Sequence, residues 1–369
     1  MPRIGFDGRA LASPAAGVRR YAHELFGALA VLDPSLAIVS VGVPGGVAMP
    51  TGIEGAPAAS SLPTNLGWML TGLPRAARRA KLDLFHAPSY TAPVGGPRPL
   101  VLTIHDISYE RNPEWYPYKR DPIRRAFYRY SARSADRVIT DSHFSKREIV
   151  DVYSIRPDTI DVVPLAAAPG FGEGPALSLP SGWPSQFVLH VGDLHVRRNG
   201  PGQHRQVAAL RTRRASWSGL GLVLAGVDRG IGAELERLNA TAGGTAPLVT
   251  FAGAAPEPLL LALYRAAHAL VYPSRYEGFG LPLLEAMACG TPVIAAQTSS
   301  IPEVVGEAAV LLDPDDEEGW IAAIARVLDD ASHRARLRAA GASRAREFSW
   351  RRTAEATALV YRRLLDNAS

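Results

Sequence analysis

The sequence of 369 residues contains a single cysteine, Cys289, and only three lysines. One cysteine excludes an intrachain disulfide framework and is typical of a reducing compartment. No segment contains the roughly 18 consecutive apolar residues that a transmembrane helix needs. The residues after Met1 lack the apolar core of a signal peptide. We therefore expect a cytoplasmic protein, in contact with the inner face of a membrane at most.

Several chemical signatures are missing as well. No group of His and Cys residues has the spacing of metal ligands, so we expect no metal site. No Gly-x-Gly-x-x-Gly follows a predicted strand, which argues against a dinucleotide-dependent oxidoreductase. No recognition motif accompanies the positive charge, so nucleic acid is not the expected partner.

The composition is that of a globular protein with sizeable cores, with 47% hydrophobic and 20% charged residues. The length is enough for about two to three domains. Arginine supplies most of the positive charge behind the net +5. A mildly basic chain favours anionic partners such as nucleotide diphosphates or acidic lipid surfaces.

Short apolar segments alternate with helical periodicity twice along the chain, which is typical of parallel sheets covered by helices on both faces. Gly and Pro are concentrated between the two halves, in residues 165–185. The predicted strands are 3–6, 36–43, 82–86, 100–104, 137–140 and 160–163, then 187–191, 220–225, 248–251, 269–272, 292–296 and 310–312. The predicted helices include 18–32, 119–136, 145–153 and 350–369, and residues 44–63 are predicted to form a loop.

We therefore predict an α/β protein of two Rossmann-like domains that face each other across a cleft. Ligands of such sheets bind beyond the carboxyl ends of the strands. The predicted parts are an N-terminal domain, 1–168, a linker, 169–185, a C-terminal domain, 186–348, and a final helical segment, 349–369.

The most informative segment is 274–293, in which Glu277 and Glu285 bracket a glycine-containing turn that leads into a helix. The amides at the start of a helix attract an anion, and Gly278 and Gly280 let a ligand approach the backbone. Two carboxylates at the same place would repel a bare phosphate, so their expected partners are hydroxyl groups. A ligand that carries both phosphates and hydroxyls is a nucleotide sugar.

This segment resembles the Glu-x7-Glu donor motif of retaining glycosyltransferases of the GT-B fold, family 4. The resemblance implies that Glu277 contacts sugar hydroxyls and that Glu285 contacts the ribose. It also implies that the turn formed by Gly278, Phe279, Gly280 and Leu281 binds the donor diphosphate, and that the last helix returns to the first domain. An ordinary loop and helix with surface glutamates is the alternative.

A second segment, 191–199, ends a strand at Gly192 and then supplies Arg197 and Arg198. Arginine holds phosphate oxygens with paired hydrogen bonds. The segment is similar to the family's Arg-Lys-Asn stretch, which neutralises the diphosphate, although Arg198 replaces the lysine. Residues 200–205 depart from the family's apolar pattern. We predict on these grounds that Gly192, Asp193 and Asn199 bind the donor, together with Gly253 at the end of a later strand. The alternative for this segment is a solvated basic turn.

In the N-terminal half, the helix that follows Gly17 resembles the family's glycine loop, which implies contact with the donor phosphate. A predicted strand ends at His105 and Asp106, and the resemblance places His105 beside the transferred sugar. Residues 112–117 are similar to members that act on polysaccharide acceptors. Ser142 and His143 are further acceptor candidates, beside a capping box that we expect at Ser145 and Glu148.

Four arginines, at 125, 129, 133 and 137, recur at the spacing of one helical face. A solvated face is one interpretation, and contact with an acidic acceptor or an anionic membrane surface is the other.

The sequence thus predicts a retaining, metal-independent hexosyltransferase with His105, Arg197, Arg198 and Glu277 in catalytic roles. GDP-mannose is the favoured donor, and UDP- or dTDP-sugars are alternatives. The acceptor is a glycan, a lipid-linked glycan or a small molecule with a free hydroxyl. A nucleotide-sugar epimerase of the same fold and a non-catalytic nucleotide-sugar binder remain open. A phosphorylase would need a lysine for pyridoxal phosphate, and the C-terminal half has none.

Overall fold

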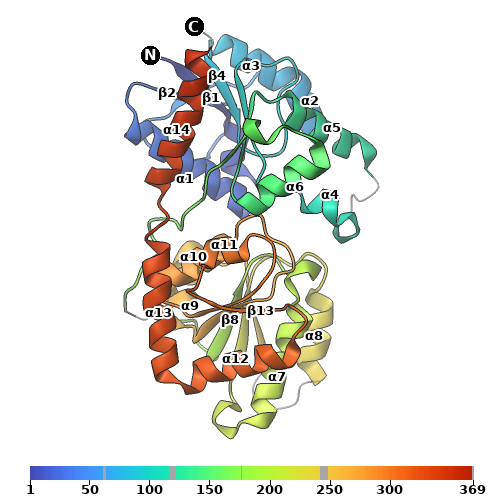
Figure 1. Ribbon diagram of the computed structural model, residues 1–369, viewed down its shortest axis with the longest axis vertical. Coiled ribbons are helices and arrows are strands. Elements are labelled where there is room, and N and C mark those ends of the chain that lie inside the picture. Colours follow the sequence, from blue (N-terminus) through green and yellow to red (C-terminus); the bar gives the residue numbers. More distant parts are fainter. Residues whose placement is uncertain (61–63, 117–120, 176, 242–247, 368–369) are drawn as a thin grey trace. The chain divides into compact units, whose positions relative to one another are not determined.

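The computed structural model describes residues 1–60, 64–116, 121–175, 177–241 and 248–367. The chain divides into two compact units (Figure 1): unit 1 comprises Met1–Ala166 and Phe348–Ser369, and unit 2 comprises Ala167–Glu347. Among the described residues, no helix combines the length and the apolar composition that crossing a membrane requires.

Unit 1 contains a sheet of seven parallel strands in the order β3-β2-β1-β4-β5-β6-β7. Six of the strands were predicted, and β3 lies inside the segment 44–63 that was predicted as a loop. The segment of β3 is Glu-Gly-Ala, which has no apolar run, so periodicity could not reveal this edge strand. Residues 61–63 of that segment lie outside the described part. The strands are β1 (Arg3–Asp7), β2 (Ala37–Val41), β3 (Glu54–Ala56), β4 (Leu84–Ala87), β5 (Leu100–Thr103), β6 (Arg137–Thr140) and β7 (Ile160–Val162).

The helix predicted over 119–136 is observed as α5, which starts after Asp121, whose side chain accepts a hydrogen bond from the Arg124 amide. Residues 119 and 120 lie outside the described part. The helical region before β4 was not predicted, because its apolar residues are interrupted by Gly72 and Pro74. The helical elements of unit 1 are α1 (Ala16–Leu32), α2 (Asn65–Gly67), η2 (Trp68–Gly72), α3 (Leu73–Arg79), α4 (Ser108–Arg111), α5 (Pro122–Ser134), α6 (His143–Tyr153) and α14 (Trp350–Asp366).

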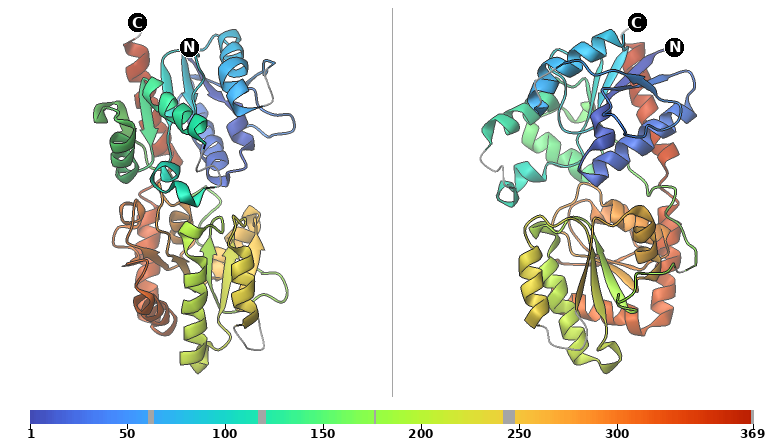
Figure 2. Two further views of the ribbon diagram at one scale, coloured as in Figure 1. Left: turned by 90° about the vertical axis from the view of Figure 1, so that its right-hand side faces the viewer. Right: turned by 180° about the vertical axis from the view of Figure 1, so that it is seen from behind.

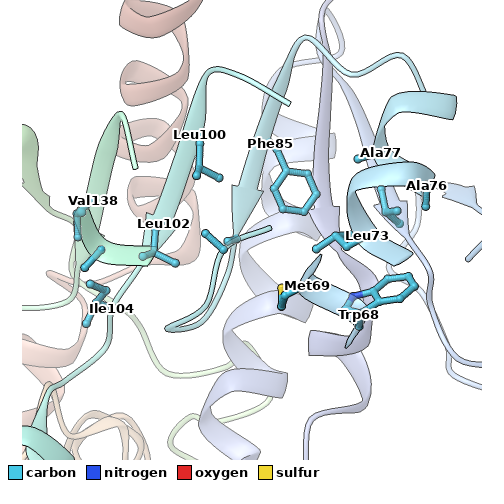
Figure 3. Packing of buried hydrophobic residues seen from close by; sticks show 14 of the residues in the cluster. Trp68, Met69, Leu73, Ala76, Ala77, Phe85, Leu100, Leu102, Ile104 and Val138 are labelled. Atoms are coloured by element: carbon cyan, nitrogen blue, oxygen red, sulfur yellow. The ribbon is translucent and has the colours of Figure 1, made fainter. Parts of the chain in front are cut away.

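That region before β4 fills one face of the sheet (Figure 3). Alternate residues of the neighbouring strands point to this face, because the side-chain period of a strand is two. Phe85 of β4 and the pair Leu100 and Leu102 of β5 are all 2% exposed or less. Trp68 and Leu73 pack against them from the helical side. Burying each large apolar side chain stabilises the fold by about 1.5–3 kcal/mol.

On the opposite face, a buried polar network joins the last helix to the sheet of unit 1. His86 follows Phe85 in β4, so its ring points away from that core; its Nδ1 lies 2.6 Å from the Tyr361 hydroxyl and its Nε2 lies 2.7 Å from Thr103 Oγ1. Burial, with a smaller effect of His105, lowers the pKa of His86 to about 3, so the ring is neutral. Helix α14 packs against α1 and ends near the start of β1 (Figure 2).

Unit 2 contains a sheet of six parallel strands in the order β10-β9-β8-β11-β12-β13. All six were predicted, with ends that agree within two residues. The strands are β8 (Phe187–Val191), β9 (Gly221–Ala225), β10 (Val249–Gly253), β11 (Ala269–Tyr272), β12 (Val293–Ala296) and β13 (Val310–Leu312). The helices are α7 (Gly200–Arg213), α8 (Gly232–Thr241), α9 (Glu257–Ala266), α10 (Leu281–Ala288), α11 (Ile301–Val305), α12 (Glu317–Asp329) and α13 (Ala331–Ala345).

The strand order of unit 2 reverses at β8, because the chain continues from β8 to β9 on one side and reaches β11 on the other. Right-handed crossovers then place α7 and α8 on one face and α9 and α10 on the opposite face, as Figure 1 shows. The loops after β8 and β11 therefore leave the sheet in opposite directions at its carboxyl edge, which is where open α/β sheets bind their ligands.

Two glycines in register bring the strand ends β8 and β9 close together. Val191 pairs with Ala225, so Gly192 and Gly226 are neighbours. A Cβ at Gly226 would overlap the Gly192 carbonyl group and come within 2.9 Å of the Asp193 amide nitrogen. Gly192 itself has a φ of +134°, and its Cα faces the Arg198 guanidinium. The backbone after β8 can take this course only when both positions lack side chains.

We expect the Gly226→Ala substitution to lower the free energy of unfolding by about 1–3 kcal/mol or more, because backbone atoms would have to move to admit the methyl group. Urea denaturation measures this change through the transition midpoint. Gly219→Ala is the matched control, since a Cβ there meets nothing within 4 Å, and its effect should stay within about 0.5 kcal/mol. Equal midpoints for the two variants would contradict the close packing of these loops.

Candidate functional site

The candidate donor site of unit 2 is built from the two loops at the strand reversal. One loop follows β8 and carries Arg197 and Arg198 in a short helical turn; the other follows β11 and carries Glu277. The Arg275 amide donates a hydrogen bond of 2.8 Å to the Arg197 carbonyl oxygen, which joins the two loops directly. The structure thus brings together two segments that lie about 80 residues apart in the sequence.

Glu277 lies at the centre of this cluster, with 7% of its side chain exposed. Its Oε2 lies 3.4 Å from Arg197 Nη1, and its Oε1 lies 3.3 Å from Arg198 Nη2. Arg197 also donates to the Tyr276 carbonyl oxygen. The two guanidinium groups and one carboxylate leave a local charge of +1, so the cluster attracts an anion.

Three residues that the sequence reading missed complete the cluster. The Tyr272 hydroxyl donates to Glu277 Oε1 at 3.0 Å and accepts from Arg198. Ser274 Oγ donates to the same carboxylate oxygen at 2.6 Å. Gln203 Nε2 donates to the Arg198 carbonyl oxygen at 3.0 Å, so the unusual polar start of α7 holds the arginine turn in place. Tyr272 ends β11 five residues before Glu277, and Ser274 lies three residues before it; this closeness in the sequence was the available signal.

The electrostatics keep Glu277 ionised. Burial alone would raise the pKa of its carboxyl group, but Arg197, Arg198 and the hydroxyls of Ser274 and Tyr272 outweigh burial and hold the pKa below 4.5. Arg198 lies over the Tyr272 ring, with Cζ 5.1 Å from the ring centroid. Its Nε is buried and makes no hydrogen bond within the described residues. A buried guanidinium with spare donor capacity suits an oxyanion.

The turn between Glu277 and α10 has the shape that the sequence predicted. Gly280 has a φ of +105° and stands at the N-cap of α10, and Pro282 lies in the first turn. Ser300 Oγ lies 2.9 Å from the Glu277 carbonyl oxygen and 3.0 Å from that of Phe279, which fixes the turn from below. The N-terminus of α10 carries the partial positive charge that favours a phosphate group.

Glu285 lies within α10, only 4% exposed. The Tyr264 hydroxyl of α9 donates to its Oε2 at 2.7 Å. Tyr264 was not singled out from the sequence, because it belongs to a helix far from the motif. Cys289 follows the last residue of the same helix as a buried free thiol, and burial raises its pKa to about 12.

The other predicted donor residues lie around this centre. Asp193 is half-buried and pairs with Arg229 at 2.9 Å. Asn199, with a φ of +52°, joins the arginine turn to α7. Gly253 lies exposed at the end of the edge strand β10, which β9 separates from β8. Among the described residues, no group of three His, Cys, Asp or Glu side chains could hold a metal ion.

The candidates of unit 1 lie at the carboxyl edge of its sheet. His105 Nδ1 lies 2.8 Å from Asp141 Oδ2. Asp106 accepts hydrogen bonds from the Ser108 amide and hydroxyl, at 2.9 and 2.8 Å. Gly17 is exposed in the first turn of α1, which begins at Ala16.

The predicted capping box of α6 is wrong. Ser142, not Ser145, is the N-cap, and its hydroxyl accepts from the Ser145 amide at 3.0 Å. Glu148 instead pairs with Arg111 of α4, with 2.7 Å between Arg111 Nε and Glu148 Oε2. Because the helix begins two residues earlier than predicted, Ser145 and Glu148 lie inside it and do not form the predicted cap. Ser142 is buried, whereas His143 next to it is exposed.

The four arginines at 125, 129, 133 and 137, the arginine stripe, do not share one helical face. Arg137 lies in β6 and pairs with Asp161, because α5 ends at Ser134. Arg125 pairs with the buried Glu110, and Arg133 Nε donates to the Tyr153 carbonyl oxygen. Three of the four arginines therefore have partners inside unit 1. The exposed positions of α5 include Ile123, Arg124, Arg129 and Tyr130.

Comparison with known proteins agrees with this architecture. The model of the family "Glycosyl transferases group 1" matches residues 185–344, and that of "Glycosyltransferase Family 4" matches residues 15–167. The O-antigen chain mannosyltransferase B of Escherichia coli is 34% identical over 298 residues, which cover 78% of this chain and 76% of that protein.

Solved structures share the fold across the whole chain. Sucrose-phosphate synthase from Thermosynechococcus elongatus has a TM-score of 0.77 at 22% identity, with 100% of both chains covered. HepE from Anabaena, solved in complex with UDP and glucose, has a TM-score of 0.73 at 18% identity and covers 99% of this chain and 100% of its own. The two parallel sheets, the matched family models and the mannosyltransferase relative show that this chain has the GT-B fold and belongs to glycosyltransferase family 4.

Proposed function

We propose that this family 4 glycosyltransferase moves a hexose, with retention and without a metal ion, from a nucleoside diphosphate sugar to a hydroxyl acceptor. GDP-mannose is the first donor to test, because the E. coli relative is named as a mannosyltransferase. UDP-glucose is the second, because HepE was solved with UDP and glucose. The observation that carries the proposal is the buried cluster of Arg197, Arg198 and Glu277 beside the start of α10.

The roles of the site residues follow from their charges and positions. Arg197 and Arg198 would hold the diphosphate and stabilise the negative charge that it gains as the sugar leaves. The turn of Phe279, Gly280 and Leu281 would bind a phosphate at the N-terminus of α10. Glu277, ionised and fixed from several sides, would accept hydrogen bonds from sugar hydroxyls.

Glu285 would accept a hydrogen bond from the ribose, with the Tyr264 bond at 2.7 Å holding its second oxygen. The departing diphosphate would take the proton of the attacking hydroxyl on the same face of the sugar, so no protein nucleophile is needed. We assign smaller donor roles to Gly17, Gly192, Asp193, Asn199 and Gly253.

In unit 1, His105 would bind a hydroxyl of the sugar, and we place Asp106, Ser142 and His143 at the acceptor. The acceptor is proposed to be a glycan, a lipid-linked glycan or a small molecule. The exposed face of α5 is the surface that we propose for an anionic membrane or an acidic acceptor, because Ile123, 69% exposed, and Tyr130, 46% exposed, are adjacent in the sequence to the exposed Arg124 and Arg129.

A thermal-shift screen against UDP, GDP, dTDP and ADP tests the donor site and identifies the base. A ligand at about 100 times its Kd stabilises the native state by about 2.7 kcal/mol, which should raise the Tm by roughly 3–4 °C for cooperative unfolding of all 369 residues. We expect one nucleoside diphosphate to give the largest shift. No shift with any of the four would contradict a nucleotide site.

Turnover then separates a transferase from a binder or an epimerase. The protein is incubated with the sugar form of the selected nucleotide, and the release of nucleoside diphosphate is measured with and without candidate glycan acceptors. A transferase releases diphosphate faster when its acceptor is present. Conversion of the donor sugar to an epimer without release would contradict the proposal.

A further inference from the structure

His105 and Asp141 of unit 1 meet because their strands are in register. Thr103 of β5 pairs with Ile139 of β6. His105 lies two residues after Thr103, and Asp141 lies two residues after Ile139. The carboxyl ends of parallel strands meet at one edge of the sheet, so the two side chains leave it side by side. The result is a hydrogen bond of 2.8 Å between His105 Nδ1 and Asp141 Oδ2. Only 3% of the Asp141 side chain and 13% of the His105 side chain are exposed.

The backbone and ring of His105 are held by further contacts from other elements. Ser145 Oγ of α6 donates to the His105 carbonyl oxygen at 3.1 Å. The Tyr21 ring of α1 meets the imidazole edge-on, with the centroids 4.7 Å apart, and the Tyr90 ring lies at 6.1 Å. Rotation or displacement of the imidazole would therefore break several contacts.

One polar atom of each side chain is left without a partner. Within the described residues, His105 Nε2 and Asp141 Oδ1 are buried and make no hydrogen bond of good geometry, although the Pro88 carbonyl oxygen lies near the imidazole. Leaving a buried polar group unsatisfied costs about 1–3 kcal/mol, so such an atom indicates a binding site for a ligand group. Because the Asp141 carboxylate can only accept, His105 Nδ1 carries the proton of their bond.

The charge of the imidazole is set by the groups around it. Burial by itself would lower the pKa of His105, but the charge of Asp141, its hydrogen bond, and smaller effects of Asp106 and the Pro88 carbonyl raise the pKa above 6.5. The facing groups on other elements are neutral: His86, Tyr21 and Tyr90. Asp141 is thus the carboxylate that stabilises the imidazolium by direct contact.

We propose that Asp141 is the positioning residue for His105, which it orients so that Nε2–H donates a hydrogen bond to a sugar hydroxyl. This inference rests on the proposed role of His105 in sugar transfer. Asp141 itself does not touch the substrate; it supplies the orientation and the negative charge that keep His105 a donor. The sequence pointed to the neighbours Ser142 and His143, and Asp141 was not singled out.

The test compares Asp141→Asn with the control Asp158→Asn, which makes the same change at a side chain that is 70% exposed in the same unit. We expect Asp141→Asn to lower kcat at least about 10-fold and to change the donor KM by less than about 3-fold. Loss of the carboxylate should lower the pKa of His105, so the alkaline limb of the pH–rate profile should move to lower pH. The control should reproduce the wild-type rate and profile.

An NMR titration of the His105 imidazole measures the same pKa without substrate and applies even if a variant turns over too slowly to assay. A wild-type pKa at or below 6.5, or an unchanged pKa in Asp141→Asn, would overturn the inference. If Asp141→Asn does not fold, Asp141→Glu, which keeps the charge, serves for the same comparison and should retain a raised pKa.

A double-mutant cycle shows whether Asp141 acts through His105. We expect Asp141→Asn to cost little further activity when it is added to His105→Ala. Independent, multiplicative losses would overturn the inference and leave the proposed function intact. Full activity of His105→Ala would refute the role of His105 as well, and full activity of Glu277→Ala would refute the proposed donor site without affecting the titration of His105.

Discussion

Replacing Glu277 with alanine is expected to lower kcat for sugar transfer by about 100-fold or more, a loss of the size seen when one preorganised group of a charged site is removed. The carboxylate is buried between Arg197 and Arg198, at 3.4 and 3.3 Å. Its removal frees both guanidinium groups to move and removes the acceptor proposed for the sugar hydroxyls. Release of nucleoside diphosphate from the selected donor measures the effect.

Two further variants separate this loss from unfolding. Glu277→Gln keeps the shape of the side chain and its contact with Ser274, and it should retain the wild-type fold by circular dichroism while still losing most of the activity. Glu318→Ala removes a glutamate that is 71% exposed and pairs with Arg213 in the same unit. We expect wild-type activity from Glu318→Ala. Wild-type activity of a properly folded Glu277→Ala variant would contradict the role of Glu277.

The second large effect is expected at Arg198. Arg198→Ala should lower kcat about 100-fold and raise the Kd of the nucleoside diphosphate about 10- to 100-fold, because a charge-assisted bond to phosphate is worth about 1.5–3 kcal/mol. The nucleoside without phosphates should bind the variant and the wild type equally well. Calorimetric titration with both ligands measures the difference.

Arg213→Ala is the matched control, since this arginine is half exposed and makes a surface pair with Glu318. Its Kd for the diphosphate should equal that of the wild type. Arg198→Lys should recover only part of the loss, because lysine cannot form the paired hydrogen bonds of a guanidinium. An Arg198→Ala variant with unchanged diphosphate affinity would remove Arg198 from the site.

The sequence predicted the architecture well because its strands are short, apolar and bounded by Gly or Pro. All six strands of unit 2 were placed, and the acidic turn was placed correctly at the start of α10 because Gly280 and Pro282 mark that start. The failures are local. β3 lacks an apolar run, and the α6 cap moved to Ser142 because two serines three residues apart both fit the cap pattern.

The side chains that orient the site could not be predicted, since they come from strand register and helix packing rather than from a motif. Tyr264 reaches Glu285 from a different helix, and Asp141 reaches His105 through the pairing of β5 with β6. The arginine stripe shows the converse problem. Its spacing of four suggested one helical face, but α5 ends before Arg137, and Asp161 pairs with that arginine.

A crystal of this protein soaked with the nucleoside diphosphate selected by the thermal screen tests the central claim most directly. We predict electron density for the two phosphates between the Arg198 guanidinium and the first turn of α10, with the ribose hydroxyls beside Glu285. Clear density for the nucleotide at any other place in unit 2, with this turn empty, would contradict it.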